Sequence, residues 1–121
     1  MPKRVLIADD SDTVRNLIQS VVEQQQDLEV CALTDNGIET IDKATDLQPD
    51  LLILDVQMPG MNGIEVASIL RRKLPNAKIV LFTIYGDAVQ SVGSAVGANA
   101  VLAKADGLGG LARTVRSLLG S

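Results

Sequence analysis

The sequence has no histidine and no tryptophan, and one tyrosine and one phenylalanine supply all of its aromatic rings. The absence of histidine excludes a histidine-ligated metal site, a Ser-His-Asp triad and a histidine phosphocarrier within this chain. Hydrophobic residues still make up 46% of the 121 positions. That fraction is sufficient for one ordinary domain, and its core must be aliphatic.

Cysteine and long apolar runs are also scarce. Cys31 is the only cysteine, which excludes an internal disulfide, and its apolar neighbours predict a small buried hydrophobe. No apolar run approaches the roughly 20 residues of a membrane span. The first residues, which run through basic Lys3-Arg4 into a short apolar stretch, do not resemble a signal peptide. We expect a soluble cytoplasmic protein without membrane partners.

Basic residues are outnumbered by acidic ones, 11 to 15, which gives a formal net charge of −4. Nucleic-acid binding depends on clusters of positive charge. The composition therefore argues against direct binding of DNA or RNA by this chain.

Short apolar runs alternate with amphipathic segments along the whole chain. This (βα)5 pattern predicts an α/β fold, in which a doubly wound, five-stranded parallel sheet carries helices on both faces. The expected strands are residues 5–8, 28–33, 51–54, 79–82 and 100–103. The expected helices are residues 13–25, a segment built on Ile38, Ile41 and Ala44 that ends at Pro49, and residues 64–74, 87–96 and 108–119.

The fourth helical segment is the weakest. It contains Gly93, and an interior glycine costs about 1 kcal/mol relative to alanine. Gly93 and Gly97 are four residues apart, a spacing that allows close helix contact, so we interpret them as a sign of packing or of mobility.

Polar residues follow the carboxyl ends of the expected strands, where ligands bind in sheets of this kind. Asp9 and Asp10 follow the first strand, Asp55 the third, Thr83 the fourth and Lys104 the fifth. Each residue alone has an ordinary explanation, such as a helix cap, a loop carboxylate or a solvated lysine. Together they predict that three carboxylates, a hydroxyl and an ammonium group meet at one edge.

Three neighbouring carboxylates repel one another, so the site requires a cation. Oxygen ligands without histidine or thiolate favour Mg²⁺. A carboxylate can also act as a nucleophile toward phosphorus, and phosphoryl transfer requires mainly positioning and neutralisation of charge. Asp55 is the candidate nucleophile because it ends the central strand.

The chain resembles the receiver domain of bacterial two-component response regulators, and is most similar to receivers of the LuxR type. The matching segments are VLIADDS at 5–11, PDLLILDVQMPGMNGIEV at 49–66, IVLFT at 79–83 and GANAVLAKAD at 97–106. The resemblance covers nearly all of the chain. It implies a single receiver domain at residues 1–121, of flavodoxin-like (CheY-like) fold with strand order 2-1-3-4-5, with any output domain lying beyond residue 121.

The resemblance also implies roles for the site residues. Asp55 would accept a phosphoryl group from a phosphohistidine on a sensor histidine kinase. Asp10, Asp55 and the backbone carbonyl of Gln57 would bind Mg²⁺ or Mn²⁺ directly, and Asp9 would bind it through water. Thr83 and Lys104 would contact the phosphoryl oxygens. The expected result is a conformational switch that acts on a protein partner or on a transcriptional output domain.

Two positions depart from the family pattern. Val101 replaces the aromatic switch residue that usually lies three positions before the lysine, and Ala105 replaces the proline that often follows it. The cis or trans state of the Lys104–Ala105 bond stays open. Tyr85, two residues after Thr83, is either a substitute for the missing aromatic or a side chain that shapes access to the site.

Three other functions fit the sequence less well. A small aspartate-nucleophile phosphatase usually has a second aspartate two residues after the nucleophile, where this chain has Gln57. A flavin or nucleotide domain requires a glycine-rich loop after the first strand, where this chain has carboxylates. A degenerate receiver used only as a binding surface would not need all five site residues. Phosphorylation is expected to produce a homodimer, either through the fourth helix, fifth strand and last helix or through the first and last helices.

Overall fold

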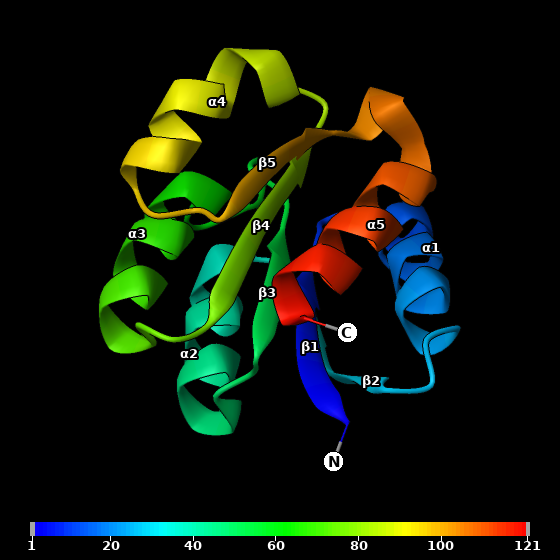
Figure 1. The fold of residues 1–121 in the computed structure, drawn as a ribbon. Coiled ribbons are helices and arrows are strands. Elements are labelled where there is room, and N and C mark those ends of the chain that lie inside the picture. The colour runs from blue at the N-terminus through cyan, green and yellow to red at the C-terminus, as the bar shows by residue number, and fades with distance from the viewer. Residues whose placement is uncertain (1, 121) are drawn as a thin grey trace.

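Five parallel strands in the order β2-β1-β3-β4-β5 form the centre of the computed structural model, which describes residues 2–120 (Figure 1). The strands are β1 (Lys3–Ala8), β2 (Leu28–Thr34), β3 (Leu51–Leu54), β4 (Lys78–Thr83) and β5 (Ala100–Ala103). The helices are α1 (Asp12–Glu23), α2 (Gly37–Leu47), α3 (Gly63–Lys73), α4 (Gly86–Ala95) and α5 (Gly107–Leu119), and a 3-10 turn, η1 (Lys104–Asp106), precedes α5. The predicted fold class and strand order are confirmed.

The sheet separates two aliphatic cores. Helices α1 and α5 cover one face, and α2, α3 and α4 cover the other (Figure 1). All four residues of β3 are fully buried, because Leu52 and Leu54 face one core while Leu51 and Ile53 face the other. Burial on both faces fixes the central strand, and with it the position of the residue that follows.

The first three helices begin at side-chain caps. Ser11, Asn36 and Asn62 each accept a hydrogen bond from the backbone amide three residues later. Such caps stabilise a helix by about 1 kcal/mol. Helices α4 and α5 have no side-chain cap, so their first turns lack this contribution.

The glycines of α4 are explained by contact with the sheet, which agrees with packing, one of the two interpretations of Gly93. An added Cβ at Gly86 would lie 2.7 Å from Cα of Ala103, and one at Gly93 would lie 2.6 Å from Cγ2 of Val101. Gly97 lies outside the helix, with a φ of +96° and the Arg71 side chain against it. The fourth helix can approach β5 closely because Gly86 and Gly93 lack side chains.

Two other details differ from the sequence predictions. Cys31 is only half-buried and lies in the edge strand β2, where the register with β1 shifts between Val5 and Leu6. Leu17, which belongs to the apolar stripe of α1, is 49% exposed. Within residues 2–120, no helix combines the length and apolar character that crossing a membrane requires.

Candidate functional site

The carboxyl ends of β1, β3, β4 and β5 bring the predicted site residues to one edge of the sheet. Asp9 and Asp55 follow β1 and β3 directly, Thr83 is the last residue of β4, and Lys104 begins η1 after β5. Carboxylate oxygens of Asp9, Asp10 and Asp55 lie within 4.8 Å of one another. Asp9 and Asp55 are buried, whereas Asp10 is exposed. The site is therefore an acidic pocket with one carboxylate open to solvent.

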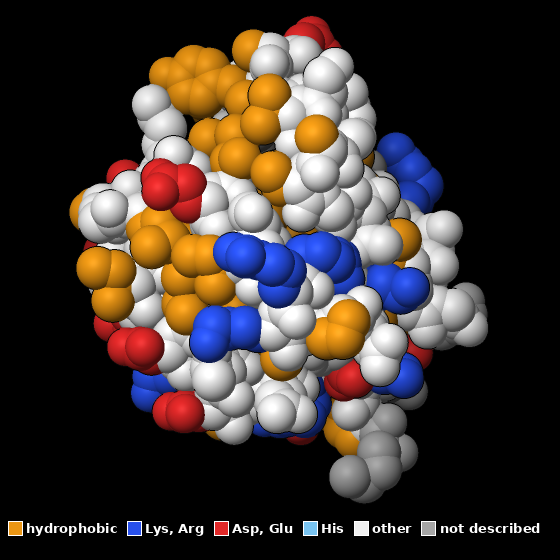
Figure 2. Space-filling model, turned by 90° about the vertical axis from the view of Figure 1, so that its left-hand side faces the viewer, with side chains coloured by type: hydrophobic (Ala, Val, Ile, Leu, Met, Phe, Trp, Pro, Cys, Tyr) orange, Lys and Arg blue, Asp and Glu red, His pale blue; other side chains and the backbone are white. Residues whose placement is uncertain are grey.

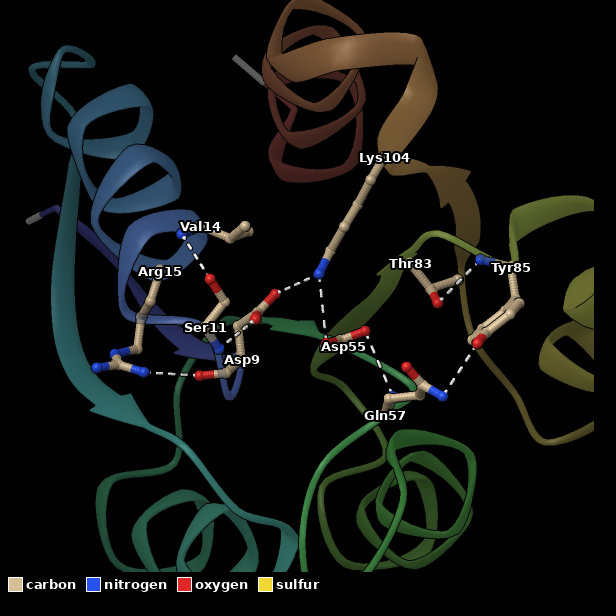
Figure 3. A network of polar contacts seen from close by, with 9 residues as sticks. All are labelled: Asp9, Ser11, Val14, Arg15, Asp55, Gln57, Thr83, Tyr85 and Lys104. Atoms are coloured by element: carbon tan, nitrogen blue, oxygen red, sulfur yellow. Dashed lines mark hydrogen bonds and ion pairs between the residues drawn. The ribbon is translucent and has the colours of Figure 1, made fainter.

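Asp9 is held by both its backbone and its side chain. Its amide donates to the carbonyl of Thr34 at 3.1 Å, and its Oδ1 accepts from the Ser11 amide at 2.9 Å. Its own carbonyl accepts a hydrogen bond from Nη1 of Arg15 at 2.7 Å (Figure 3). These bonds fix the loop between β1 and α1, from which Asp10 also extends.

Lys104 supplies the positive charge of the site. Its Nζ lies 2.8 Å from Oδ2 of Asp9 and 3.3 Å from Oδ2 of Asp55, between the two carboxylates (Figure 3). Burial alone would lower the lysine pKa, but the close contact with Asp9 and the charges of both aspartates outweigh it and raise that pKa. Lys104 therefore stays charged throughout the physiological pH range.

Asp55 lies in surroundings that oppose its ionisation. Burial is the main cause that raises its pKa, and the neighbouring Asp9 charge adds to it. Lys104 and the Gln57 amide, which donates to Oδ1 of Asp55 at 3.4 Å, act in the opposite direction but do not cancel the shift. One ammonium group thus leaves the three carboxylates incompletely neutralised.

A divalent cation fits this donor set. Oδ2 of Asp9 is buried and accepts no well-directed hydrogen bond from the described residues, so its contact with Lys104 is an ion pair only. Hard cations such as Mg²⁺ and Mn²⁺ bind carboxylate oxygens and retain several water molecules. Asp9, Asp10 and Asp55 together offer such oxygens, and exposed Asp10 leaves the cluster accessible.

A polar bridge connects the loop after β3 to the start of α4. Nε2 of Gln57 donates to the Tyr85 hydroxyl at 3.1 Å, and the Tyr85 amide donates to Oγ1 of Thr83 at 3.2 Å (Figure 3). Gln57 and Tyr85 also line an open cavity of about 570 Å³ beside Asp10. The bridge therefore borders an open space next to the acidic cluster.

Three details extend the sequence predictions. The peptide bond between Lys104 and Ala105 is trans, as are all those of the described chain. Val101 is buried beneath Gly93 of α4, so the position of the missing aromatic is filled by close packing. Arg15 was not identified from the sequence. An arginine in a first helical turn gives no signal until the loop conformation brings a carbonyl within its reach.

Comparison with known proteins identifies relatives of this architecture. The family model described as response regulator receiver domain matches residues 5–116. The transcriptional regulatory protein LnrK of Bacillus subtilis is 34% identical over 84 residues, which are 69% of this chain and 38% of that protein. A protein-glutamate methylesterase/protein-glutamine glutaminase of Thermotoga maritima is 33% identical over 81 residues, 67% of this chain and 24% of its own length.

The solved structures include a similar fold. A DNA-binding response regulator of the LuxR family from Staphylococcus aureus has a TM-score of 0.89 and 26% identity, and the alignment covers 96% of this chain and 98% of that one. The matches span less than half the length of both curated relatives. The similarity to those two proteins therefore concerns one part of each.

Proposed function

This chain belongs to the response regulator receiver domain family, and we propose that it is a phosphorylation-dependent signalling switch with Asp55 as the phosphoacceptor. The observation that carries the proposal is the position of Asp55. It is a buried carboxylate at the end of the central strand, 3.3 Å from a lysine ammonium group and within 4.8 Å of two further carboxylates. No other described carboxylate combines these features.

The proposed reaction is a single phosphoryl transfer. A carboxylate oxygen of Asp55 attacks the phosphorus of a phosphohistidine on a sensor histidine kinase. The new O–P bond forms as the N–P bond breaks, and the imidazole leaves with the electron pair of that bond. Asp9, Asp10, Asp55 and the Gln57 carbonyl would hold Mg²⁺ or Mn²⁺, which would neutralise charge on the transferred group.

Lys104 and Thr83 would then respond to the phosphorylated carboxylate. The Lys104 ammonium group already contacts Asp55 and is positioned to pair with a phosphoryl oxygen. The Thr83 hydroxyl accepts from the Tyr85 amide, and a hydroxyl that accepts one bond can still donate its hydrogen. We propose that Thr83 turns this hydrogen toward the phosphoryl group, which would disturb its contact with Tyr85.

The energy of the switch must come from several contacts. One hydrogen bond to a charged group contributes about 1.5–3 kcal/mol. Reversing a population from 1:99 to 99:1 requires about 5.5 kcal/mol. Thr83 alone cannot supply this energy. We propose that the Lys104 pairing and movement of Tyr85 with the start of α4 supply the remainder, since the Gln57–Tyr85 bridge joins α4 to the acceptor loop.

The relatives support a proposal for the output of the switch. The Bacillus subtilis relative is named a transcriptional regulatory protein, and the Staphylococcus aureus structure is that of a DNA-binding regulator. We propose that residues 1–121 act as one receiver domain and control transcription through an attached output domain, which would bind the DNA. A partner protein that binds a stand-alone receiver is the alternative, and phosphorylation would favour a homodimer in either case.

A small phosphodonor tests the acceptor directly. We expect intact mass spectrometry to show a single phosphoryl addition when the protein is incubated with Mg²⁺ and acetyl phosphate. The addition should be absent from an Asp55→Ala variant and should persist, more slowly, in Asp9→Ala. If wild-type protein gains no mass with any small donor or phosphohistidine protein, the proposed function is wrong.

A further inference from the structure

Arg15 makes a contact that the stability of its own helix does not explain. It is the fourth residue of α1, close to the positive end of the helix dipole, where a cation is unfavourable. Its side chain is only 16% exposed, although its ion-pair partner Asp12 is 84% exposed. Exposed ion pairs contribute little, so the Arg15–Asp12 pair does not account for the burial of a guanidinium group at this position.

The guanidinium group reaches back to the acidic loop. Nη1 donates to the backbone carbonyl of Asp9 at 2.7 Å, while Nη2 faces Asp12. The Asp9 carbonyl belongs to the peptide unit that connects Asp9 to Asp10. The oxygen of this peptide unit thus accepts a hydrogen bond from Arg15. On the other side of Asp9, its amide donates to the carbonyl of Thr34.

We propose that Arg15 is a positioning residue for divalent-cation binding, because it fixes the Asp9–Asp10 peptide and so directs both carboxylates toward Asp55. Figure 3 shows Arg15 and Lys104 approaching Asp9 from different elements, one at its backbone and the other at its carboxylate. The inference rests on the proposed function, since it assumes that the acidic cluster binds Mg²⁺.

Positioning and simple electrostatics predict opposite results for Arg15. A cation near three carboxylates repels Mg²⁺, so if charge alone mattered, its removal would tighten Mg²⁺ binding. If Arg15 orients the loop, its removal weakens binding, because groups that orient metal ligands typically contribute 10- to 100-fold in affinity. The direction of the change therefore distinguishes the two roles.

The test is a calorimetric titration with Mg²⁺ of the wild-type protein, Arg15→Met, Arg15→Lys and the control Asp12→Asn. We expect about tenfold weaker binding for Arg15→Met. Arg15→Lys should fall between Met and wild type, because it keeps the charge but lacks the two-pronged guanidinium group. Asp12→Asn should bind as wild type does, because it leaves the contact with the Asp9 carbonyl in place.

Melting temperatures without Mg²⁺ separate a structural role from a positioning role. A residue that only supports the fold would lower the melting temperature and leave the Mg²⁺ dissociation constant unchanged, which would overturn the inference. Unchanged or tighter binding by Arg15→Met would also overturn it, and if that variant does not fold, Arg15→Lys decides. If the wild-type protein binds no Mg²⁺, both the proposed metal site and this inference fail.

Discussion

The fold opposes the ionisation of Asp55. Burial and the charge of Asp9 raise its pKa above the ordinary aspartate value of about 3.9. The folded state therefore keeps the proton at a pH where the unfolded chain has lost it. The stability that this preference contributes is fully present below the unfolded pKa and is lost as the pH rises through the folded pKa.

Asp55→Asn should therefore stabilise the metal-free protein at pH 7. Asparagine has nearly the same shape but cannot ionise, so the variant escapes the cost of a buried charge beside Asp9. We expect thermal unfolding in a chelating buffer to show a higher melting temperature for the variant at pH 7, and a difference that shrinks toward pH 4. A lower melting temperature of Asp55→Asn than of the wild-type protein at pH 7 would contradict the upward shift of the Asp55 pKa.

Mg²⁺ and an exposed aspartate provide controls for this prediction. Millimolar Mg²⁺ should raise the melting temperature of the wild-type protein more than that of Asp55→Asn, because a ligand stabilises the state that binds it. Asp46→Asn, which changes an exposed carboxylate in α2, should show neither the pH-dependent gain nor an altered response to Mg²⁺.

The sequence identified the side chains of the site but not the contacts that hold them. Asp9, Asp55 and Thr83 could be placed because parallel strands present their carboxyl ends at one edge. The bond from Arg15 to the Asp9 carbonyl could not be predicted, since it depends on the path of the loop backbone. Likewise, the hydrogen bond between Gln57 and Tyr85 joins residues 28 positions apart that have no shared pattern.

At the level of helices, two glycines with the same low helix propensity differ in whether packing requires them. Gly86 starts α4 where an added Cβ would lie 2.7 Å from the Ala103 backbone, whereas a Cβ at Gly109 in α5 would meet only an Arg113 side-chain nitrogen at 3.6 Å. Gly109 also lacks the positive φ of Gly107. Neither packing nor backbone conformation requires glycine at position 109.

Alanine substitutions should therefore change stability in opposite directions. We expect Gly86→Ala to lower the free energy of unfolding by about 2 kcal/mol through overpacking against β5. Gly109→Ala should raise it by about 0.5–1 kcal/mol through helix propensity and a less flexible unfolded chain. Urea unfolding at equal protein concentration measures both changes. Two shifts of the same sign would show that packing does not distinguish the glycines.

The glycines also show which contacts cannot be predicted from the secondary-structure pattern of the sequence. The alternation of apolar runs and amphipathic segments was sufficient to predict the five strands and five α-helices of residues 2–120, with ends that differ by at most two residues. Propensity marked α4 as weak because of Gly93, but the missing side chain is what lets the helix pack against Val101. Tertiary contacts of this kind leave no periodic signal in the sequence.

On the scale of the whole molecule, α4 presents a surface with little charge near the site. Its only charged residue is Asp87. Ile84, Tyr85 and Val92 are 63%, 42% and 48% exposed, respectively. Figure 2 shows hydrophobic side chains gathered over the α4 region at the top of the molecule. Hydrogen bonds join Tyr85 of this surface to Thr83 and Gln57 beside the acidic site. Exposed Leu17 of α1 lies on another surface.

We therefore expect phosphorylation to produce a homodimer through the α4 surface. Sedimentation velocity with Mg²⁺ and beryllofluoride, a phosphoryl mimic, should show a dimer for the wild-type protein and a monomer for Val92→Glu, because an interface cannot bury an unpaired charge without a large cost. Leu17→Glu is the matched control on the α1 surface and should still dimerise. Loss of the dimer in Leu17→Glu alone would assign the interface to α1 and α5 instead.

Tyr85 tests whether the acceptor and the α4 surface are connected. Tyr85→Ala removes both the ring and the bridge to Gln57, whereas Tyr85→Phe removes only the hydroxyl that accepts from Gln57. If the ring transmits the change, Tyr85→Ala should gain the phosphoryl group from acetyl phosphate but stay monomeric, and Tyr85→Phe should still dimerise. A Tyr85→Ala protein that dimerises normally would exclude Tyr85 as the substitute for the missing aromatic, and would leave Lys104 and the packing of α4 as the source of the switch.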